Sequence, residues 1–156
     1  MAVVGAGTAA ATTDAAAEAV GRLLAEAGAV VVCGGLGGVM AAACRGAAQA
    51  GGLTIGILPG DHRTLANQWV RVVIPTGLGE LRNGLVVRAA ETLIAVGGEY
   101  GTLSEIALAL KLGRPVVGLH TWELHRPEGQ LDQGIVVASD PRDAVDRALG
   151  LAAAGR

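Results

Sequence analysis

Aromatic side chains are almost absent from this sequence. Its 156 residues include two tryptophans, one tyrosine and no phenylalanine, and the formal net charge is −2 with no block of basic residues. Proteins that bind single-stranded nucleic acid generally combine a basic groove with aromatic side chains on which bases stack. The sequence therefore predicts no nucleic-acid partner.

Cysteines and long apolar runs are also scarce. Cys33 and Cys44 are too few for a disulfide framework, and their spacing matches no zinc motif. The start of the chain does not resemble a signal peptide, and no apolar run reaches about 18 residues. No cluster of histidine and carboxylates suggests a metal site, and His62, His120 and His125 are predicted to lie on the surface. We expect a reduced, cytoplasmic protein without a membrane span.

Glycine is abundant, at 25 residues, and apolar residues make up 51% of the chain. The length suits one domain over residues 1–156 with one hydrophobic core. The glycines cluster at the ends of apolar runs and form no repeat. This distribution predicts tight turns between strands and helices rather than disorder.

Short apolar runs alternate with alanine-rich helical segments. Several predicted strands are apolar throughout, as in a parallel sheet covered by helices on both faces. The pattern predicts an α/β fold with a doubly wound, mostly parallel sheet of about six or seven strands. Thr12 or Thr13 is expected to cap the first helix and Asp140 the last. The predicted strands are Ala2–Gly5, Val30–Cys33, Leu53–Leu58, Val70–Ile74, Thr92–Val96, Pro115–Leu119 and Ile135–Val137. The predicted helices are Thr13–Ala27, Val39–Ala50, Leu81–Ala90, Thr102–Leu112 and Pro141–Leu151.

Ligands of such sheets bind beyond the carboxyl ends of the strands, so turns that lead from a strand into a helix are the candidate sites. The first, "GAGTAA", contains Gly5 and Gly7 and fits the G-x-G-x-x-A form of the dinucleotide fingerprint. The complete signal needs a carboxylate at the end of the next strand, where this chain has Cys33. We therefore expect a tight turn that borders a ligand, and not ordinary NAD binding.

The second turn, "CGGLGGVM", places four glycines between a strand and a helix. Backbone N–H groups there, together with the positive end of the helix dipole, favour an anion. No Lys-Ser or Lys-Thr pair follows, so this is not a Walker loop. The prediction is a phosphate or ribose contact; the alternative is a crowded turn without room for a Cβ atom. The residues assigned to the site are Gly34, Gly35, Gly37, Gly38 and Met40.

The third turn, "GGEYGTLSE", contains Gly97, Gly98 and Gly101. Thr102 and Glu105 stand three residues apart, as in a capping box, which would explain them without any ligand. A capping box needs none of the three glycines, however. They indicate exposed backbone that a ligand approaches, with Glu105 one turn into the helix.

Arg82 is the candidate cation. A helix antiparallel to the strand Thr92–Val96 would begin near the carboxyl end of that strand, and Arg82 lies near the start of the predicted helix. Arg82 is therefore expected on the same rim as "GGEYGT", whereas Arg88 should lie further away. The alternative for either arginine is a solvated salt bridge.

The stretch "RNGLVVRAAETLIAVGGEYGTLSEIALAL" resembles the LOG family, whose motif is PGGxGTxxE preceded by an arginine. "GGLGGVMAAACRGA" resembles an earlier GGGxxGLM turn of the same family. The resemblance extends to about Leu119 and is closer to a short branch of Rossmann-like proteins that includes molybdenum-cofactor carrier proteins. It implies a Rossmann-like fold and at least a homodimer.

LOG enzymes are phosphoribohydrolases that cleave nucleoside 5′-monophosphates to base and ribose 5-phosphate. The resemblance implies that Arg82 and Glu105 are the catalytic pair and that Gly98, Gly101 and Thr102 bind the phosphate. A carboxylate such as Glu105 would stabilise the oxocarbenium-like sugar or activate water.

Two departures from the motif bear on this activity, because Gly97 replaces the proline and Glu99 replaces a glycine. A carboxylate at Glu99 would repel a phosphate docked closely on that loop.

Two functions follow from these observations. The first is hydrolysis of the N-glycosidic bond of nucleoside monophosphates, with no required cofactor. The second is a non-catalytic carrier or sensor that binds the molybdenum cofactor or a nucleotide as cargo. A blander third reading is a vestigial pocket. Lysine decarboxylation is excluded because that chemistry needs a lysine Schiff base with PLP, and the only lysine, Lys111, lies at the wrong end of its helix.

Overall fold

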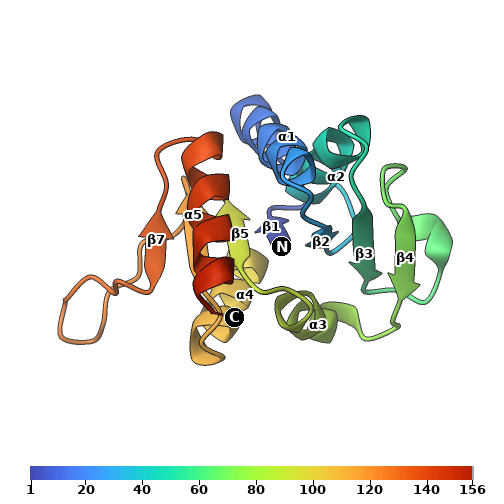
Figure 1. Cartoon of the computed structure of the whole chain (residues 1–156). Coiled ribbons are helices and arrows are strands. Elements are labelled where there is room, and N and C mark those ends of the chain that lie inside the picture. Colours follow the sequence, from blue (N-terminus) through green and yellow to red (C-terminus); the bar gives the residue numbers. More distant parts are fainter. Residues whose placement is uncertain (156) are drawn as a thin grey trace.

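Seven parallel strands form one sheet in the computed structural model, which describes residues 1–155 (Figure 1). Helices cover both faces, so the predicted doubly wound α/β fold is confirmed. The strands are β1 (Ala2–Gly5), β2 (Val31–Cys33), β3 (Thr54–Leu58), β4 (Val72–Pro75), β5 (Leu93–Val96), β6 (Val116–Leu119) and β7 (Ile135–Val137). The α-helices are α1 (Ala11–Glu26), α2 (Val39–Gln49), α3 (Asn83–Arg88), α4 (Tyr100–Lys111) and α5 (Pro141–Ala154).

The order of the strands is β4-β3-β2-β1-β5-β6-β7. From β1 the chain adds strands outward to β4, then returns to the centre and continues in the other direction from β5. The order therefore reverses between β1 and β5, and the loops after these two strands leave toward opposite faces. In open parallel sheets this reversal point is where ligands bind.

The helices divide unequally between the two faces. Val3 of β1 packs into a core with α1, α2 and α5, whereas Ala2 and Val4 pack into a second core with α3 and α4. Successive side chains of a strand point to opposite faces. Because both faces of the central strands are covered, these strands are apolar throughout instead of alternating.

Some predicted boundaries differ from the observed ones. The helix predicted over Leu81–Ala90 begins as a 3₁₀ turn, Gly79–Arg82, and continues as α3. Helix α4 begins at Tyr100, two residues before the predicted start. Another 3₁₀ turn, Arg63–Leu65, was not predicted.

The two predicted helix caps have different outcomes. Asp140 caps α5, because its carboxylate accepts a hydrogen bond from the Asp143 N–H at 2.9 Å. The prediction that Thr12 or Thr13 caps α1 was wrong. This helix begins at Ala11, so both threonines lie inside the first turn, and the N-cap residue is Ala10, which has no side-chain acceptor.

The polar segment 120–133 forms a loop that extends away from the sheet beside β7 (Figure 1). Arg126 and Asp132 form an ion pair across the loop at 3.2 Å. At its base Leu124 and Trp122 pack against the core on the α4 side, and the Trp122 ring lies 5.8 Å from that of Tyr100. The loop is thus anchored beside the first turn of α4.

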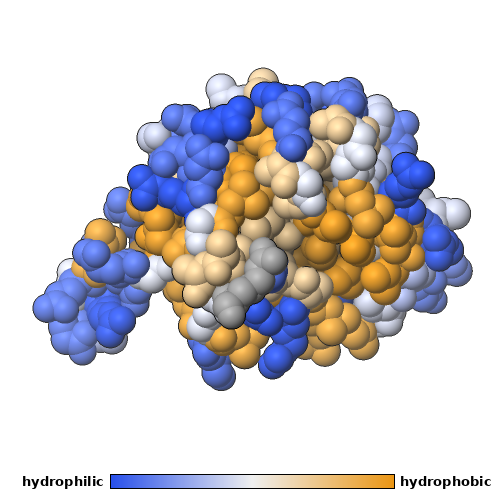
Figure 2. All heavy atoms as spheres, in the orientation of Figure 1, coloured by the Kyte–Doolittle hydropathy of each residue, from blue (hydrophilic) through white to orange (hydrophobic). Residues whose placement is uncertain are grey.

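Apolar side chains are exposed where β4 and α3 lie (Figure 2). We call this the β4–α3 apolar surface; its members are Val72, Ile74, Leu81 and Leu85, of which Leu81 is 81% exposed. In the part of the chain that the structure describes, the α-helices that cover this face of the sheet are α3 and α4. Within residues 1–155, no helix combines the length and apolarity needed to cross a bilayer.

Candidate functional site

A cavity of about 260 Å³ lies at the reversal point between β1 and β5. All three glycine-rich turns contribute to its wall. The lining residues are Val4, Gly5, Ala6, Gly7, Gly34, Met40, Glu80, Arg82, Asn83, Glu99, Gly101, Thr102 and Glu105.

The first two turns interlock through their backbones. The Val39 N–H donates to the Ala6 carbonyl at 3.1 Å, and a Cβ atom on Gly38, whose φ is 57°, would lie 2.3 Å from the same oxygen. The N-terminus of α2 is therefore partly capped by the protein itself. The second turn lines the cavity with Gly34 and Met40, and not with Gly38.

Gly35 and Gly37, the remaining glycines of the second turn, lie where a side chain would contact neighbouring residues too closely. A Cβ atom on Gly35 would lie 2.6 Å from the Leu58 side chain, and one on Gly37 would lie 3.1 Å from the Gly7 carbonyl. Neither residue lines the cavity. At these positions the structure corresponds to the alternative of a crowded turn without room for side chains.

Gly34 lies against the guanidinium of Arg82 in the wall of the cavity. A Cβ atom there would lie 2.6 Å from a terminal nitrogen of Arg82. Glycine at this position leaves the space that the guanidinium occupies. The second turn and Arg82 therefore depend on each other sterically.

The third turn leads into α4 without a side-chain cap. Its N-cap residue, Glu99, forms no capping hydrogen bond, and Gly101 and Thr102 of the first helical turn line the cavity. The capping box between Thr102 and Glu105 is not formed. N–H groups at such a helix start have no partner within the helix and favour an anion.

Gly97 and Gly98 lie beside the main cavity rather than in its wall. Gly97 borders a neighbouring cavity at the start of α1, and its carbonyl accepts a hydrogen bond from the Thr121 hydroxyl at 2.5 Å. Gly98 has φ 125°, and a Cβ atom on it would lie 2.6 Å from the Thr102 side chain. Both glycines shape the turn, while Gly101 and Thr102 form the wall.

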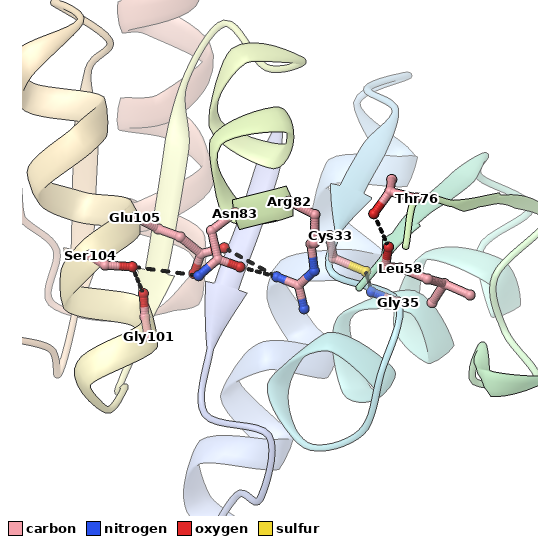
Figure 3. A network of polar contacts seen from close by, with 9 residues as sticks. All are labelled: Cys33, Gly35, Leu58, Thr76, Arg82, Asn83, Gly101, Ser104 and Glu105. Carbon is pink, nitrogen blue, oxygen red and sulfur yellow. Dashed lines mark hydrogen bonds and ion pairs between the residues drawn. The ribbon is translucent and has the colours of Figure 1, made fainter. Parts of the chain in front are cut away.

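Arg82 and Glu105 meet at the centre of the site, as the sequence predicted for one rim (Figure 3). Their closest nitrogen and oxygen atoms are 3.9 Å apart, and each side chain is only 8% exposed. Arg82 also donates to the side-chain oxygen of Asn83. The Arg82 Nε–H is buried and has no hydrogen-bond acceptor among residues 1–155. A buried guanidinium that lines a cavity favours an anionic partner there.

Burial raises the pKa of Glu105 to about 7; Arg82 opposes this rise and Glu80 adds to it. Glu80 and Glu99 line the same cavity, so three carboxylates share the space with one arginine. Near neutral pH, Glu105 therefore exchanges between a neutral and an ionised form.

The structure also shows where the other charged residues considered in the sequence analysis lie. Arg88 lies exposed in the last turn of α3, away from the cavity lining. Lys111 ends α4, at the opposite end from the site. Asn83 was missed, although it directly follows Arg82 and begins α3. Its position at the start of a helix was the available signal, because that end faces the carboxyl edge of the sheet.

The sequence matches the SLOG cluster4 family over residues 1–145. An uncharacterized protein of Archaeoglobus fulgidus is 42% identical over 144 residues, which cover 92% of this chain and 90% of that protein.

Two solved structures are also similar. The molybdenum cofactor binding protein of Rippkaea orientalis is 37% identical with a TM-score of 0.86, over 96% of this chain and 94% of that one. The molybdenum cofactor carrier protein of Chlamydomonas reinhardtii is 36% identical with a TM-score of 0.83, over 97% and 96% of the two chains.

Proposed function

The chain belongs to the SLOG cluster4 family, and from this membership and the cavity we propose that it is a non-catalytic carrier of the molybdenum cofactor, a phosphorylated pterin. The observation that carries the proposal is the buried Arg82, whose side chain lines a cavity that carboxylates also line. The similarity to molybdenum cofactor binding and carrier proteins supports the same ligand. We take residues 1–156 as one binding domain.

The cavity offers groups for both parts of such a ligand. Arg82 suits the phosphate, because a guanidinium forms charge-assisted hydrogen bonds to an anion. A pterin ring carries N–H groups, and carboxylates such as Glu80 and Glu99 can accept hydrogen bonds from them. Glu99, which would repel a phosphate docked on its loop, thereby finds a role in this proposal.

Co-expression tests the proposal. The protein is produced in a host that makes the cofactor, purified, and analysed for molybdenum by mass spectrometry and for pterin by fluorescence after oxidation. We expect both to co-purify in near-equal amounts with the chain. Protein that retains neither, while the Rippkaea orientalis protein prepared in parallel retains both, would disprove the carrier role.

Hydrolysis of nucleoside 5′-monophosphates is the second candidate function. It is favoured by one observation: a carboxyl group with a pKa of about 7 faces the cavity beside an arginine, as general acid–base catalysis requires. Incubation of the purified protein with AMP at comparable concentrations distinguishes the two. The carrier proposal expects no free adenine; release of adenine that is lost in Glu105→Gln would establish the hydrolase instead.

The affinity for a phosphorylated ligand is expected to fall as the pH rises through about 7. Ionised Glu105 competes for Arg82 and repels the ligand, whereas protonated Glu105 leaves the guanidinium to the phosphate. Binding therefore takes up a proton, and affinity should fall by up to about tenfold per pH unit above the pKa of Glu105. Isothermal titration between pH 6 and pH 9 measures this slope.

Glu105→Gln is the control for this pH dependence. The phosphate itself gains charge near pH 6, an effect that acts equally in both proteins. The difference between the two slopes therefore isolates Glu105. Parallel slopes would show that this carboxyl group does not titrate against the ligand.

We also propose a cytoplasmic homo-oligomer, and the β4–α3 apolar surface supports subunit contact. The free thiols Cys33 and Cys44 suit a reducing compartment. Light scattering during size exclusion measures the mass of the assembly; a monomer at all concentrations would argue against the contact.

A further inference from the structure

Three sulfur-containing residues pack together beneath the wall of the cavity. Cys33 ends β2, while Met40 and Cys44 stand four residues apart on α2 and therefore share one face of that helix. The three residues form a separate buried cluster, with Cys33 and Cys44 fully buried and Met40 8% exposed. The two Cys Sγ atoms lie 3.4 Å apart, and both thiols are free.

Polar groups contact the sulfur of Cys33. The Gly35 N–H donates to the Cys33 Sγ at 3.3 Å. Figure 3 shows Cys33 and Glu105 on opposite sides of Arg82. Thiols that served only as small apolar side chains would need none of these groups.

We propose that Cys33 Sγ, Cys44 Sγ and Met40 Sδ form a binding site for a soft monovalent metal ion, Cu(I). Thiolate and thioether sulfur are the ligands that select this ion. Leu36, Trp69 and Val70 pack around the cluster, and the Asn67 side chain lies beside Cys44.

Charge and atoms balance in this site. Each thiol loses its proton to solvent as its sulfur–copper bond forms, and copper stays in the +1 state, so no oxidant or reductant is needed. Two thiolates and Cu(I) leave one negative charge, which Arg82 opposes. With metal–sulfur bonds of about 2.3 Å, three-coordinate binding separates the sulfurs by about 4 Å, slightly more than the 3.4 Å between the thiols.

The ion has a route into the site. Met40 belongs to the cluster and also lines the cavity at the sheet edge. A flexible thioether at this border can first take the ion and then pass it to the buried thiols. The proposal concerns residues behind the wall, and it stands whether or not the cavity holds a pterin.

Anaerobic competition between cargo-free protein and a Cu(I)–bicinchoninate complex tests the site. We expect one copper ion per chain and release of two protons. Cys33→Ala and Cys44→Ala should each weaken binding by about 100-fold or more, because even groups behind the ligands change metal affinity by about 10- to 100-fold. Met40→Leu, which keeps volume and apolarity, should weaken it less.

X-ray absorption at the copper edge of the wild-type protein avoids any effect of the substitutions on folding. We expect sulfur neighbours only. The proposal is overturned by nitrogen or oxygen neighbours, by wild-type affinity no higher than that of the Cys33→Ala/Cys44→Ala variant, or by a Cys33–Cys44 disulfide in place of bound copper.

Discussion

Arg82→Gln is expected to lower the affinity for a phosphorylated ligand by about 100-fold. A hydrogen bond to a charged group contributes about 1.5–3 kcal/mol, and each 1.4 kcal/mol is a factor of ten. Glutamine keeps much of the length of the side chain but removes the charge and the planar fork. The loss also removes the cation that opposes the raised pKa of Glu105, so this carboxyl group becomes harder to ionise.

Arg88→Gln is the matched control for this experiment. It removes the same charge from the same helical segment, but Arg88 is exposed in the last turn of α3 and does not line the cavity. Retained molybdenum and titration with a phosphorylated pterin give the two affinities. Equal losses in both variants would mean that net charge, and not the buried guanidinium, governs binding.

Gly46→Ala is expected to destabilise the protein by about 3 kcal/mol or more. Helices α1 and α2 touch along their backbones, because a Cβ atom on Gly46 would lie 1.9 Å from the Glu18 carbonyl oxygen. A Cβ atom on Gly21 would lie equally close to the Ala43 carbonyl oxygen. Overpacking ordinarily costs about 1–3 kcal/mol, and here the obstacle is backbone, so one helix must move away from the other.

Gly150→Ala is expected to have the opposite effect and to stabilise the protein. Gly150 lies inside α5, and a Cβ atom there would meet nothing within 4 Å. Alanine should therefore stabilise the helix by about 0.5–1 kcal/mol. Urea unfolding of both variants measures the two free energies; a Gly46→Ala protein as stable as the wild type would show that the helices are not in backbone contact.

The strands could be predicted from their continuous apolar runs, and the rim of the site could be predicted from the direction of the helix that carries Arg82. A strand that is apolar at every position is typical of a parallel sheet with helices on both faces. In this chain the run Leu93–Val96 is fully buried in that way. The closeness of Arg82 and Glu105 followed from the antiparallel course of a helix and the next strand.

The roles of individual glycines could not be predicted, because they depend on contacts between turns. A glycine that faces a ligand and one that faces another backbone look alike in sequence. Gly34 and Gly38 stand four residues apart in one turn, yet the first makes room for Arg82 and the second for the Ala6 carbonyl. The contact between Cys33 and Cys44 depends likewise on how α2 lies on β2.

The interlock of the first two turns bears on how new binding preferences could arise in proteins of this shape. The Ala6 carbonyl is the acceptor for the Val39 N–H, so an insertion in either the first or the second glycine-rich turn would displace both turns. We therefore expect the part of the cavity wall that these two turns form to change little among related proteins. Divergence should instead concentrate in the segment that starts α4 and in the residues around Arg82. Mutant libraries that aim to change which ligand the cavity binds are best confined to those two segments.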